Sequence, residues 1–310
     1  MLEIFKTINE ELVSLDHFEE GVWVNLTSPS EEEIAAVCEG LQVESEYVRA
    51  ALDEEERARI EYENGQTLII VDIPVADEEA DTIYTTIPLG IVLAKDSIIT
   101  VCLKENSVIR DFIVKRVKSF YTFYKNRFIL KILYKNASQY LQYLRIIDKI
   151  SGRIEQDLHK SMKNKELIQL LKLEKSLVYF STSLKANEAV LEKMLRLEYI
   201  KKYPDDTDLL EDVIIENKQA IEMANIYSSI LSGTMDAFAS IISNNVNIVM
   251  KFLASVTIVM AIPTMVASFY GMNVAKIPFA HSPHAFTIVL AISLTLSALS
   301  AFILAKRKMF

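Results

Sequence analysis

Cysteine, proline and glycine are scarce in this sequence, with two, seven and seven copies in 310 residues. The two cysteines, Cys38 and Cys102, are too few for a disulfide scaffold, and we expect both to be reduced thiols without a structural or catalytic role. No proline occurs in residues 89–203, which is typical of long helices. The scarcity of these residues therefore favours a helix-rich intracellular protein.

Catalytic motifs are also absent. No cluster of His, Cys or Ser has catalytic spacing, and no Gly-x-x-x-x-Gly-Lys-Ser/Thr loop occurs, so we expect neither an enzyme nor a transporter driven by that nucleotide-binding loop. The formal net charge of -9 and a pI near 5.2 argue against nucleic acid as a partner and are compatible with divalent cations.

Charged residues are missing from two long stretches near the C-terminus. Phe252–Tyr270 has 19 residues and Ile277–Ala305 has 29 residues without Asp, Glu, Lys or Arg, against the roughly 20 that a spanning helix needs. The mean hydropathy of +0.20 is high for a chain that is 24% charged. We therefore expect these two stretches to be transmembrane helices, which accounts for the high mean hydropathy of the chain.

The orientation of these helices follows from their basic flanks. Lys251 precedes the first, and residues 306–308 (Lys-Arg-Lys) follow the second, whereas the connecting segment carries only Lys276. Positively charged flanks favour the cytoplasmic side. The N-terminus MLEIFKTINEEL has no basic segment followed by an apolar one, so we expect no cleaved signal peptide. Both termini are thus expected in the cytoplasm of a multi-pass cell-membrane protein.

Residues 1–105 are expected to form a small α/β domain, because short β-rich runs alternate there with turn residues. Asn64-Gly65 predicts a hairpin turn. Ser28-Pro29-Ser30-Glu31 supplies a cap, a proline for the first turn and a capping-box glutamate, which predicts a helix over Ser30–Leu41. The expected strands are Val22–Asn25, Arg59–Tyr62, Thr67–Ile73, Ile91–Ala94 and Ile98–Cys102.

Helical spacing of apolar residues continues from 106 to 203 and predicts long packed helices, with Ile109, Phe112, Ile113, Val117 and Phe120 at its start. Tyr203-Pro204 then breaks the pattern, and Asp205 or Asp206 is placed to cap a new helix. Asp208–Tyr270 would form one helix of about 95 Å, so the stalk and the first span are predicted to be continuous. Its near-heptad face suits packing against other helices; it comprises Ile214, Ile221, Ala224, Tyr227, Leu231, Met235, Phe238 and Ile242.

The first span ends in the motif Gly271-Met272-Asn273, followed by a short loop and a last span that closes on basic residues. In this context the sequence resembles the CorA family of divalent-cation channels. The resemblance implies an α/β cytosolic domain, a long α-helical stalk and two C-terminal transmembrane helices in a funnel-shaped homopentamer. The expected regions are 1–105 (α/β domain), 106–203 (long helices), 204–250 (stalk), 251–271 (first span), 272–284 (outer loop), 285–305 (second span) and 306–310 (basic tail).

The chemistry of magnesium fits an uncharged motif. Mg²⁺ dehydrates reluctantly and is usually bound with waters still attached. A ring of Asn273 amide oxygens could accept from those waters, and Gly271 leaves its backbone carbonyl uncovered, so Gly271, Met272 and Asn273 are the expected selectivity residues. The alternative is a left-handed C-cap, for which glycine after a helix is common.

Two helices cannot enclose a hydrated path, so conduction requires several copies. Polar residues suited to face water are Asn247, Thr257 and Thr264, although the threonines can instead bond back to helix carbonyls. Pro263 is expected to bend the helix. The resemblance implies pore-lining roles for Asn247, Met250, Leu253 and Thr264, with Met250 and Leu253 as a hydrophobic constriction.

Six acids gather at the start of the stalk without a Lys or Arg among them: Asp205, Asp206, Asp208, Glu211, Asp212 and Glu216. They could bind cytosolic Mg²⁺, or they form a solvated acidic face. The resemblance implies regulatory ions that bridge neighbouring subunits and hold the channel closed. Asp212 matches one such position and Asp208 is near it; partners in the α/β domain are expected among Asp72, Asp77 and Asp81.

These features predict a magnesium channel, with cobalt and nickel as further candidate ions, that mediates influx and is gated by cytosolic Mg²⁺. Mg²⁺ is then both the transported and the regulatory ion, and the expected partners are four further copies of the chain and the lipid bilayer. Two alternatives stay open. One is a carrier of zinc or another divalent cation on the same scaffold, and the other is a membrane-anchored sensor without transport.

Overall fold

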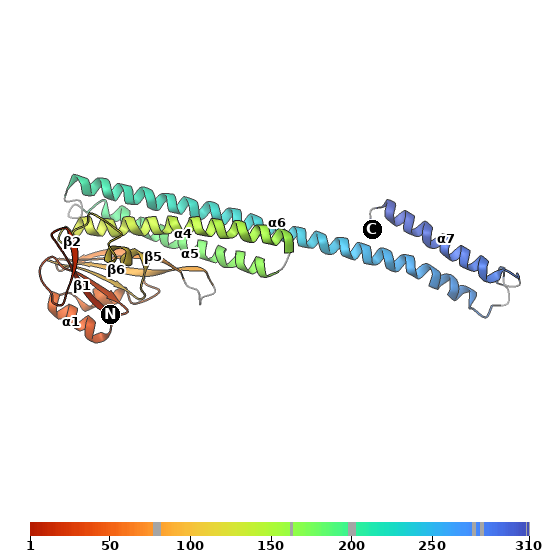
Figure 1. Ribbon diagram of the computed structural model, residues 1–310, viewed down its shortest axis with the longest axis horizontal. Helices are drawn as coiled ribbons and strands as arrows, with labels where there is room; N and C mark the ends of the chain where they lie inside the picture. Colours follow the sequence, from red (N-terminus) through yellow and green to blue (C-terminus); the bar gives the residue numbers. More distant parts are fainter. Residues whose placement is uncertain are drawn as a thin grey trace. The chain divides into compact units, whose positions relative to one another are not determined.

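A computed structural model describes residues 1–76, 82–161, 164–197, 203–274, 277–279, 282–307 and 309 (Figure 1). The chain divides into two compact units, Met1–Thr234 and Met235–Phe310.

The first unit is built on a seven-stranded sheet with the order β2-β1-β3-β7-β6-β5-β4. Neighbouring strands are antiparallel except for the parallel pair β3 and β7. The strands are β1 (Leu2–Ile8), β2 (Glu11–Leu15), β3 (Trp23–Thr27), β4 (Arg59–Glu63), β5 (Gln66–Ala76), β6 (Tyr84–Leu93) and β7 (Ile98–Cys102).

Helices cover both faces of this sheet, which is why its central strands are apolar at successive positions rather than at every second one. The short helices α1 (Glu31–Leu41) and α2 (Ser45–Ala50) pack on the face that includes Leu68 and Ile70. The other face, with Ile69 and Val71, packs against the remaining helices of this unit. These are α3 (Ser107–Ile113), α4 (Lys125–Ser161), α5 (Asn164–Met194) and the beginning of α6 (Pro204–Tyr270).

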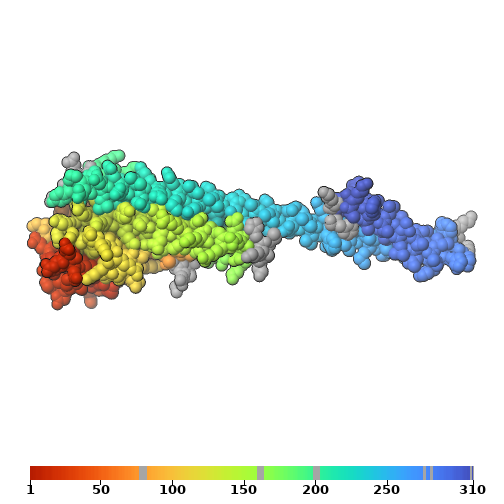
Figure 2. Space-filling view, turned by 45° about the horizontal axis from the view of Figure 1, so that its top comes forward, coloured from red at the N-terminus to blue at the C-terminus, as the bar shows by residue number. Residues whose placement is uncertain are grey.

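The first part of α6 lies along α4 and α5, as the teal and yellow-green surfaces show (Figure 2). Leu210, Val213 and Ile214 of α6 belong to the same apolar core as the sheet. Every position of the predicted near-heptad face between Ile214 and Ile242 is buried or partly buried. That face of the stalk helix is thus confirmed as a packing face.

Each predicted strand overlaps a strand of the sheet and the hairpin is present, but the strand predicted over Ile91–Ala94 is only the end of β6, which begins at Tyr84. Asn64 and Gly65 have φ values of 51° and 78°, as a tight turn with two left-handed residues requires, and β4 and β5 pair antiparallel on either side. The prediction missed the hairpin of β1 and β2, whose turn residues Asn9 and Glu10 also have positive φ. A turn without glycine gave a weak signal.

Three local predictions were wrong. The helix over 31–41 is capped by Ser30 with Glu33, not by Ser28 with Glu31. The helical pattern after residue 106 stops at Ile113, because the chain turns through left-handed residues at 115 and 119; the apolar residues at 117 and 120 therefore lie in a loop. Finally, α6 begins at Pro204, so Asp205 and Asp206 lie in its first turn rather than at its cap.

The outer edge of β5 is completed by side chains instead of a strand. Pairing with β4 ends at Ile70, and beyond it the Asp72 backbone N–H donates to Asn187 Oδ1 (2.8 Å) while Asn187 Nδ2 donates to the Asp72 carbonyl (2.8 Å). Asn136 and Tyr140 of α4 also donate to that carbonyl, at 2.9 and 3.2 Å. An amide side chain on α5 thus replaces the ladder bonds of a missing strand.

The Asp72 carboxyl group makes the stability of this region depend on pH. Burial raises the pKa of Asp72 above its ordinary value of 3.8, and the hydrogen bond with Ser183 only partly offsets this. A raised native pKa means that the stabilising contribution is complete below the unfolded pKa and is lost as the pH rises through the native pKa. Ionised Asp72 therefore costs stability at neutral pH.

We expect Asp72→Asn to have a higher thermal unfolding midpoint than the wild type at pH 7, and the difference to shrink as the pH approaches 3.8. Circular dichroism of the full chain in detergent measures both midpoints. Asp96→Asn, at an exposed position, is the control and should shift little. A lower midpoint for Asp72→Asn at pH 7 would contradict the account.

Candidate functional site

The second unit contains the two helices that are long and apolar enough to cross a membrane, the last part of α6 and α7 (Ala285–Lys306). In Figure 1, α7 runs back beside the end of α6. The buried Ser255 hydroxyl lies within hydrogen-bond distance of two carbonyls, that of Lys251 in its own helix (2.8 Å) and that of Met309 (3.1 Å), so its proton is shared between α6 and the segment after α7. The contact with Met309 could not be read from the sequence because Ser255 and Met309 are far apart in it.

One face of α6 packs in this unit. Ser255 is buried, and the positions that recur with it at helical spacing are partly buried. They are Val259, Ile262, Val266 and Tyr270. At 3.6 residues per turn, these positions share one side of the helix.

The predicted pore-lining positions lie on the other side. Met250, Leu253, Thr264 and Gly271, together with Thr257, fall within about 60° of one another around the helix axis and roughly opposite the packed face. We call these five positions the α6 stripe. Met250 and Leu253 are 58% and 57% exposed, and all five positions are exposed. Asn247, also exposed, lies at the edge of the stripe, about one-sixth of a turn away.

The threonine hydroxyls of the stripe bond back to their own helix. Thr257 Oγ1 donates to the Leu253 carbonyl (2.8 Å) and Thr264 Oγ1 to the Met260 carbonyl (3.4 Å). This bond back to the helix was the alternative interpretation of both threonines. It occupies only the proton of each hydroxyl group. Their oxygens keep lone pairs that can accept from water. The helix is continuous through Pro263.

Gly271 has no need, within a single chain, to be glycine. Its φ is not positive, since Gly21 and Gly65 are the described glycines with that conformation, so the left-handed C-cap is not formed. A Cβ atom there would meet only the Ala267 and Ser268 carbonyl oxygens, at 3.4 and 3.7 Å, which is ordinary contact. Within the described residues nothing therefore requires glycine at this position.

Asn273 and Met272 extend this uncharged end of the stripe. Both are exposed, and within the described segments the Asn273 side-chain amide makes no hydrogen bond. Its oxygen is available to accept from water or a hydrated ion. No carboxylate lies in described residues 252–274, so this end of α6 offers dipoles without fixed charge.

The acids at the start of α6 separate into two groups. Asp205 and Asp206 form ion pairs with Arg127 of α4, at 3.2 and 3.1 Å, a long-range pairing that the sequence did not reveal. Asp208 and Asp212 are exposed and form no ion pair with any residue the structure describes. They are four positions apart and share one side of the helix.

The expected partners of these acids are only partly visible. Asp77 and Asp81 lie outside the described residues. Asp72 is partly buried beside α4 and α5, and its carboxyl bonds to Ser183. Among described residues, no group of three or more His, Cys, Asp or Glu side chains is arranged to hold a metal ion.

Comparison with known proteins finds relatives among magnesium transport proteins. The family model described as CorA-like Mg²⁺ transporter protein matches residues 18–307. The cobalt/magnesium transport protein CorA of Methanocaldococcus jannaschii is 27% identical over 292 residues, which cover 91% of this chain and 89% of that protein.

Two solved structures share the fold of the whole chain. The complete CorA magnesium transporter of M. jannaschii superposes with a TM-score of 0.83 at 24% identity, covering 98% of this chain and 96% of that one. The full-length CmaX protein gives a TM-score of 0.73 at 16% identity, covering 98% and 97%. The predicted fold class, an α/β domain with a long helix and two C-terminal apolar helices, is confirmed.

The geometry of Gly271 predicts that Gly271→Ala will change the thermal unfolding midpoint by no more than about 2 °C, because the added methyl group meets no obstacle in the chain. Gly90→Ala is the matched contrast, since its Cβ would lie 2.6 Å from the Ala51 Cβ atom. Overpacking of that kind costs about 1–3 kcal/mol. Circular dichroism in detergent compares them, and equal midpoints for the two variants would contradict the steric argument.

Proposed function

The chain belongs to the CorA family of Mg²⁺ transporters, and from this premise we propose that it is a channel through which Mg²⁺ flows into the cytoplasm across the cell membrane, with Co²⁺ and Ni²⁺ as further substrates. Since this is a family of transporters, the prediction that the protein is not an enzyme is confirmed. An inside-negative potential favours entry by about 2.3 kcal/mol per elementary charge per 100 mV, so a divalent ion needs no other energy source.

The observation that carries the proposal is the exposed α6 stripe. The packed face of the span is occupied within the chain, whereas the side with Met250, Leu253 and Thr264 is left without a partner. Two helices cannot enclose water, so a hydrated path along the stripe would require further copies around an axis. The family resemblance gives five copies, a homopentamer with the stripe of each subunit facing a central path.

In that assembly, each stretch of the stripe has a distinct task. Gly271, Met272 and Asn273 would form a ring of uncharged oxygens that accepts from the waters of hydrated Mg²⁺. Thr264 and Asn247 would add polar positions along the path. Met250 and Leu253 would form an apolar constriction that closes by excluding water.

The orientation follows from the charged ends of the spans. Lys251 precedes the first span, and Lys306 and Arg307 end the second, so both termini are placed in the cytoplasm. The Gly-Met-Asn ring then faces outside, where Mg²⁺ enters.

Asn273→Ala tests the selectivity ring. In liposomes with an imposed potential, we expect Mg²⁺ uptake to fall about tenfold, equivalent to losing about 1.4 kcal/mol of stabilisation at the ring. Asn244→Ala is the control, because Asn244 is an exposed asparagine of the same helix outside the charge-free span and should keep normal uptake.

Competition with Co²⁺, Ni²⁺ and Zn²⁺ in the same assay separates the alternatives. Uptake that prefers Zn²⁺ and survives Asn273→Ala would indicate a carrier that uses other ligands. A complete lack of divalent flux in the wild type would indicate a sensor and refute the channel.

We further propose that cytosolic Mg²⁺ closes the channel by binding Asp208 and Asp212 together with acids of a neighbouring subunit, for which Asp77 and Asp81 are the candidates. Supporting this, the Asp208 and Asp212 side chains are exposed and carry no ion pair among described residues. Mg²⁺ usually keeps several waters and uses only one or two carboxylates from a given site. Such an ion favours the closed assembly by binding it more tightly than the open one.

The double variant Asp208→Asn/Asp212→Asn is expected to need about ten times more internal Mg²⁺ for half-maximal inhibition of uptake, equivalent to about 1.4 kcal/mol of lost binding. Glu222→Gln provides the control, as an exposed acid of the same helix, and should retain normal inhibition. Inhibition of the double variant at the wild-type concentration would contradict these assignments.

A further inference from the structure

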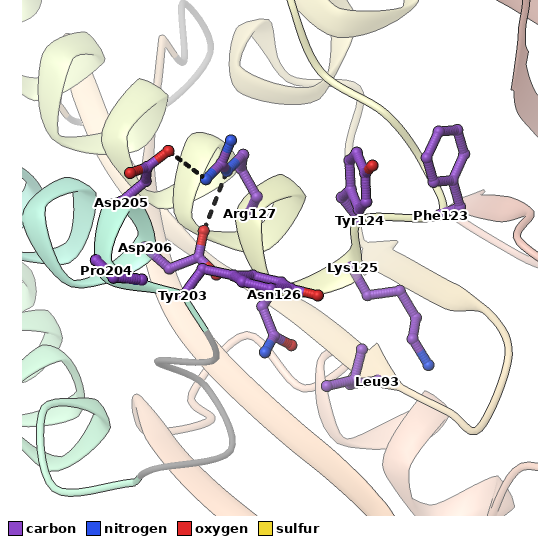
Figure 3. Close-up of a pocket in the computed structure, with 10 residues that line it drawn as sticks. All are labelled: Leu93, Phe123, Tyr124, Lys125, Asn126, Arg127, Tyr203, Pro204, Asp205 and Asp206. Carbon is purple, nitrogen blue, oxygen red and sulfur yellow. Dashed lines mark hydrogen bonds and ion pairs between the residues drawn. The ribbon is translucent and has the colours of Figure 1, made fainter.

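A pocket of about 670 Å³ lies in the first unit where the starts of α4 and α6 meet the turn after β6 (Figure 3). It is separate from the α6 stripe and from Asp208 and Asp212. Its volume falls within the range of small-molecule sites, about 300–1,000 Å³. The residues that line it are Leu93, Phe123, Tyr124, Lys125, Asn126, Arg127, Tyr203, Pro204, Asp205 and Asp206.

A guanidinium group is fixed in the wall of this pocket. Arg127 Nε donates to Asp206 (3.1 Å), whose side chain is only 2% exposed, and Nη2 donates to Asp205 (3.2 Å). The hydrogen bond with Asp206 is the main cause that raises the pKa of Arg127 above its usual value. Within the described residues Nη1 makes no hydrogen bond, so a pre-oriented edge of the group is left to donate to an oxyanion.

The remaining charges favour an anion. The Lys125 ammonium is held in place by the carbonyls of Ala94 and Lys95. Lys125 and Arg127 together balance the carboxylates of Asp205 and Asp206. The start of α4, a helix of 37 residues with no acid in its first turn, adds a positive helix end to this wall, whereas the start of α6 carries Asp205 and Asp206 in its own first turn.

Aromatic rings form the rest of the wall. Phe123, Tyr124 and Tyr203 are 46%, 51% and 51% exposed, and the rings of Phe123 and Tyr124 lie 4.6 Å apart at 58°. Figure 3 shows Tyr124 and Phe123 on the side of the pocket away from the two aspartates. Half-exposed rings beside an arginine are the elements on which a nucleobase stacks.

We propose that this pocket binds a nucleoside phosphate, with the phosphate at the Arg127 edge and the start of α4, and the base against the tyrosine rings. The ligand must carry both parts, because the charged wall recognises an oxyanion and the aromatic wall recognises a planar ring. The proposal does not depend on the transport activity.

Equilibrium dialysis of the purified full-length protein in detergent, at one fixed free Mg²⁺ concentration, tests this with ATP, adenosine and inorganic phosphate as separate probes. We expect saturable ATP binding and much weaker binding of adenosine and of phosphate. No saturable ATP binding, or phosphate binding as tight as that of ATP, would overturn the proposal.

Two variants locate the site. Tyr203→Ala removes a ring but no ion pair and should weaken ATP binding roughly tenfold, as loss of a stacking partner does. Arg127→Lys keeps the charge beside Asp206 but removes the planar edge, and should also weaken binding. Tyr179→Ala, at a half-exposed tyrosine of α5, is the control. Should Arg127→Lys fail to fold, Tyr203→Ala decides: unchanged ATP affinity in that variant would refute this pocket as the site.

Discussion

The continuity of α6 is the constraint on which the rest of this structure depends. One helix of 67 residues contributes Leu210 and Val213 to the core beside the sheet and ends next to the Gly-Met-Asn motif. A helix satisfies its own backbone hydrogen bonds, so it can pass from a water-surrounded domain into hydrocarbon without a break. Any ion bound by acids near its start is therefore bound by the same helix that carries the stripe.

The two sides of the membrane-spanning part of α6 differ in what they contact. The side with Ser255 and Val259 is satisfied by packing within the chain, whereas the opposite side carries apolar and hydroxyl groups that the chain alone leaves exposed. In a membrane, an apolar face can contact lipid without cost, whereas polar groups at that depth need water or a hydrogen-bond partner. In the proposed assembly of several copies, the polar groups of the stripe would face water instead of lipid.

The opposite end of α6 is held by charge pairs as well as by apolar contacts. Arg127 binds both Asp205 and Asp206 and so joins the start of α6 to the start of α4. Once these two acids are paired, the exposed acids that remain in the run are Asp208, Glu211 and Asp212, of which Asp208 and Asp212 lie one helical turn apart. The pairing also leaves a fixed guanidinium edge beside the aromatic rings of Tyr124 and Tyr203.

The sequence by itself determined the features that depend on local composition and period. The two uncharged stretches, the Asn64-Gly65 hairpin and the packing face of the stalk were all predictable, because each is encoded in neighbouring residues. The hairpin of β1 and β2 was missed, since its turn has no glycine. Only the tertiary structure decided which residues meet across long separations: Arg127 with Asp206, Asn187 with the Asp72 backbone, and Ser255 with Met309. Such pairs form only when the elements pack together, and the local sequence pattern does not specify which elements pack against each other.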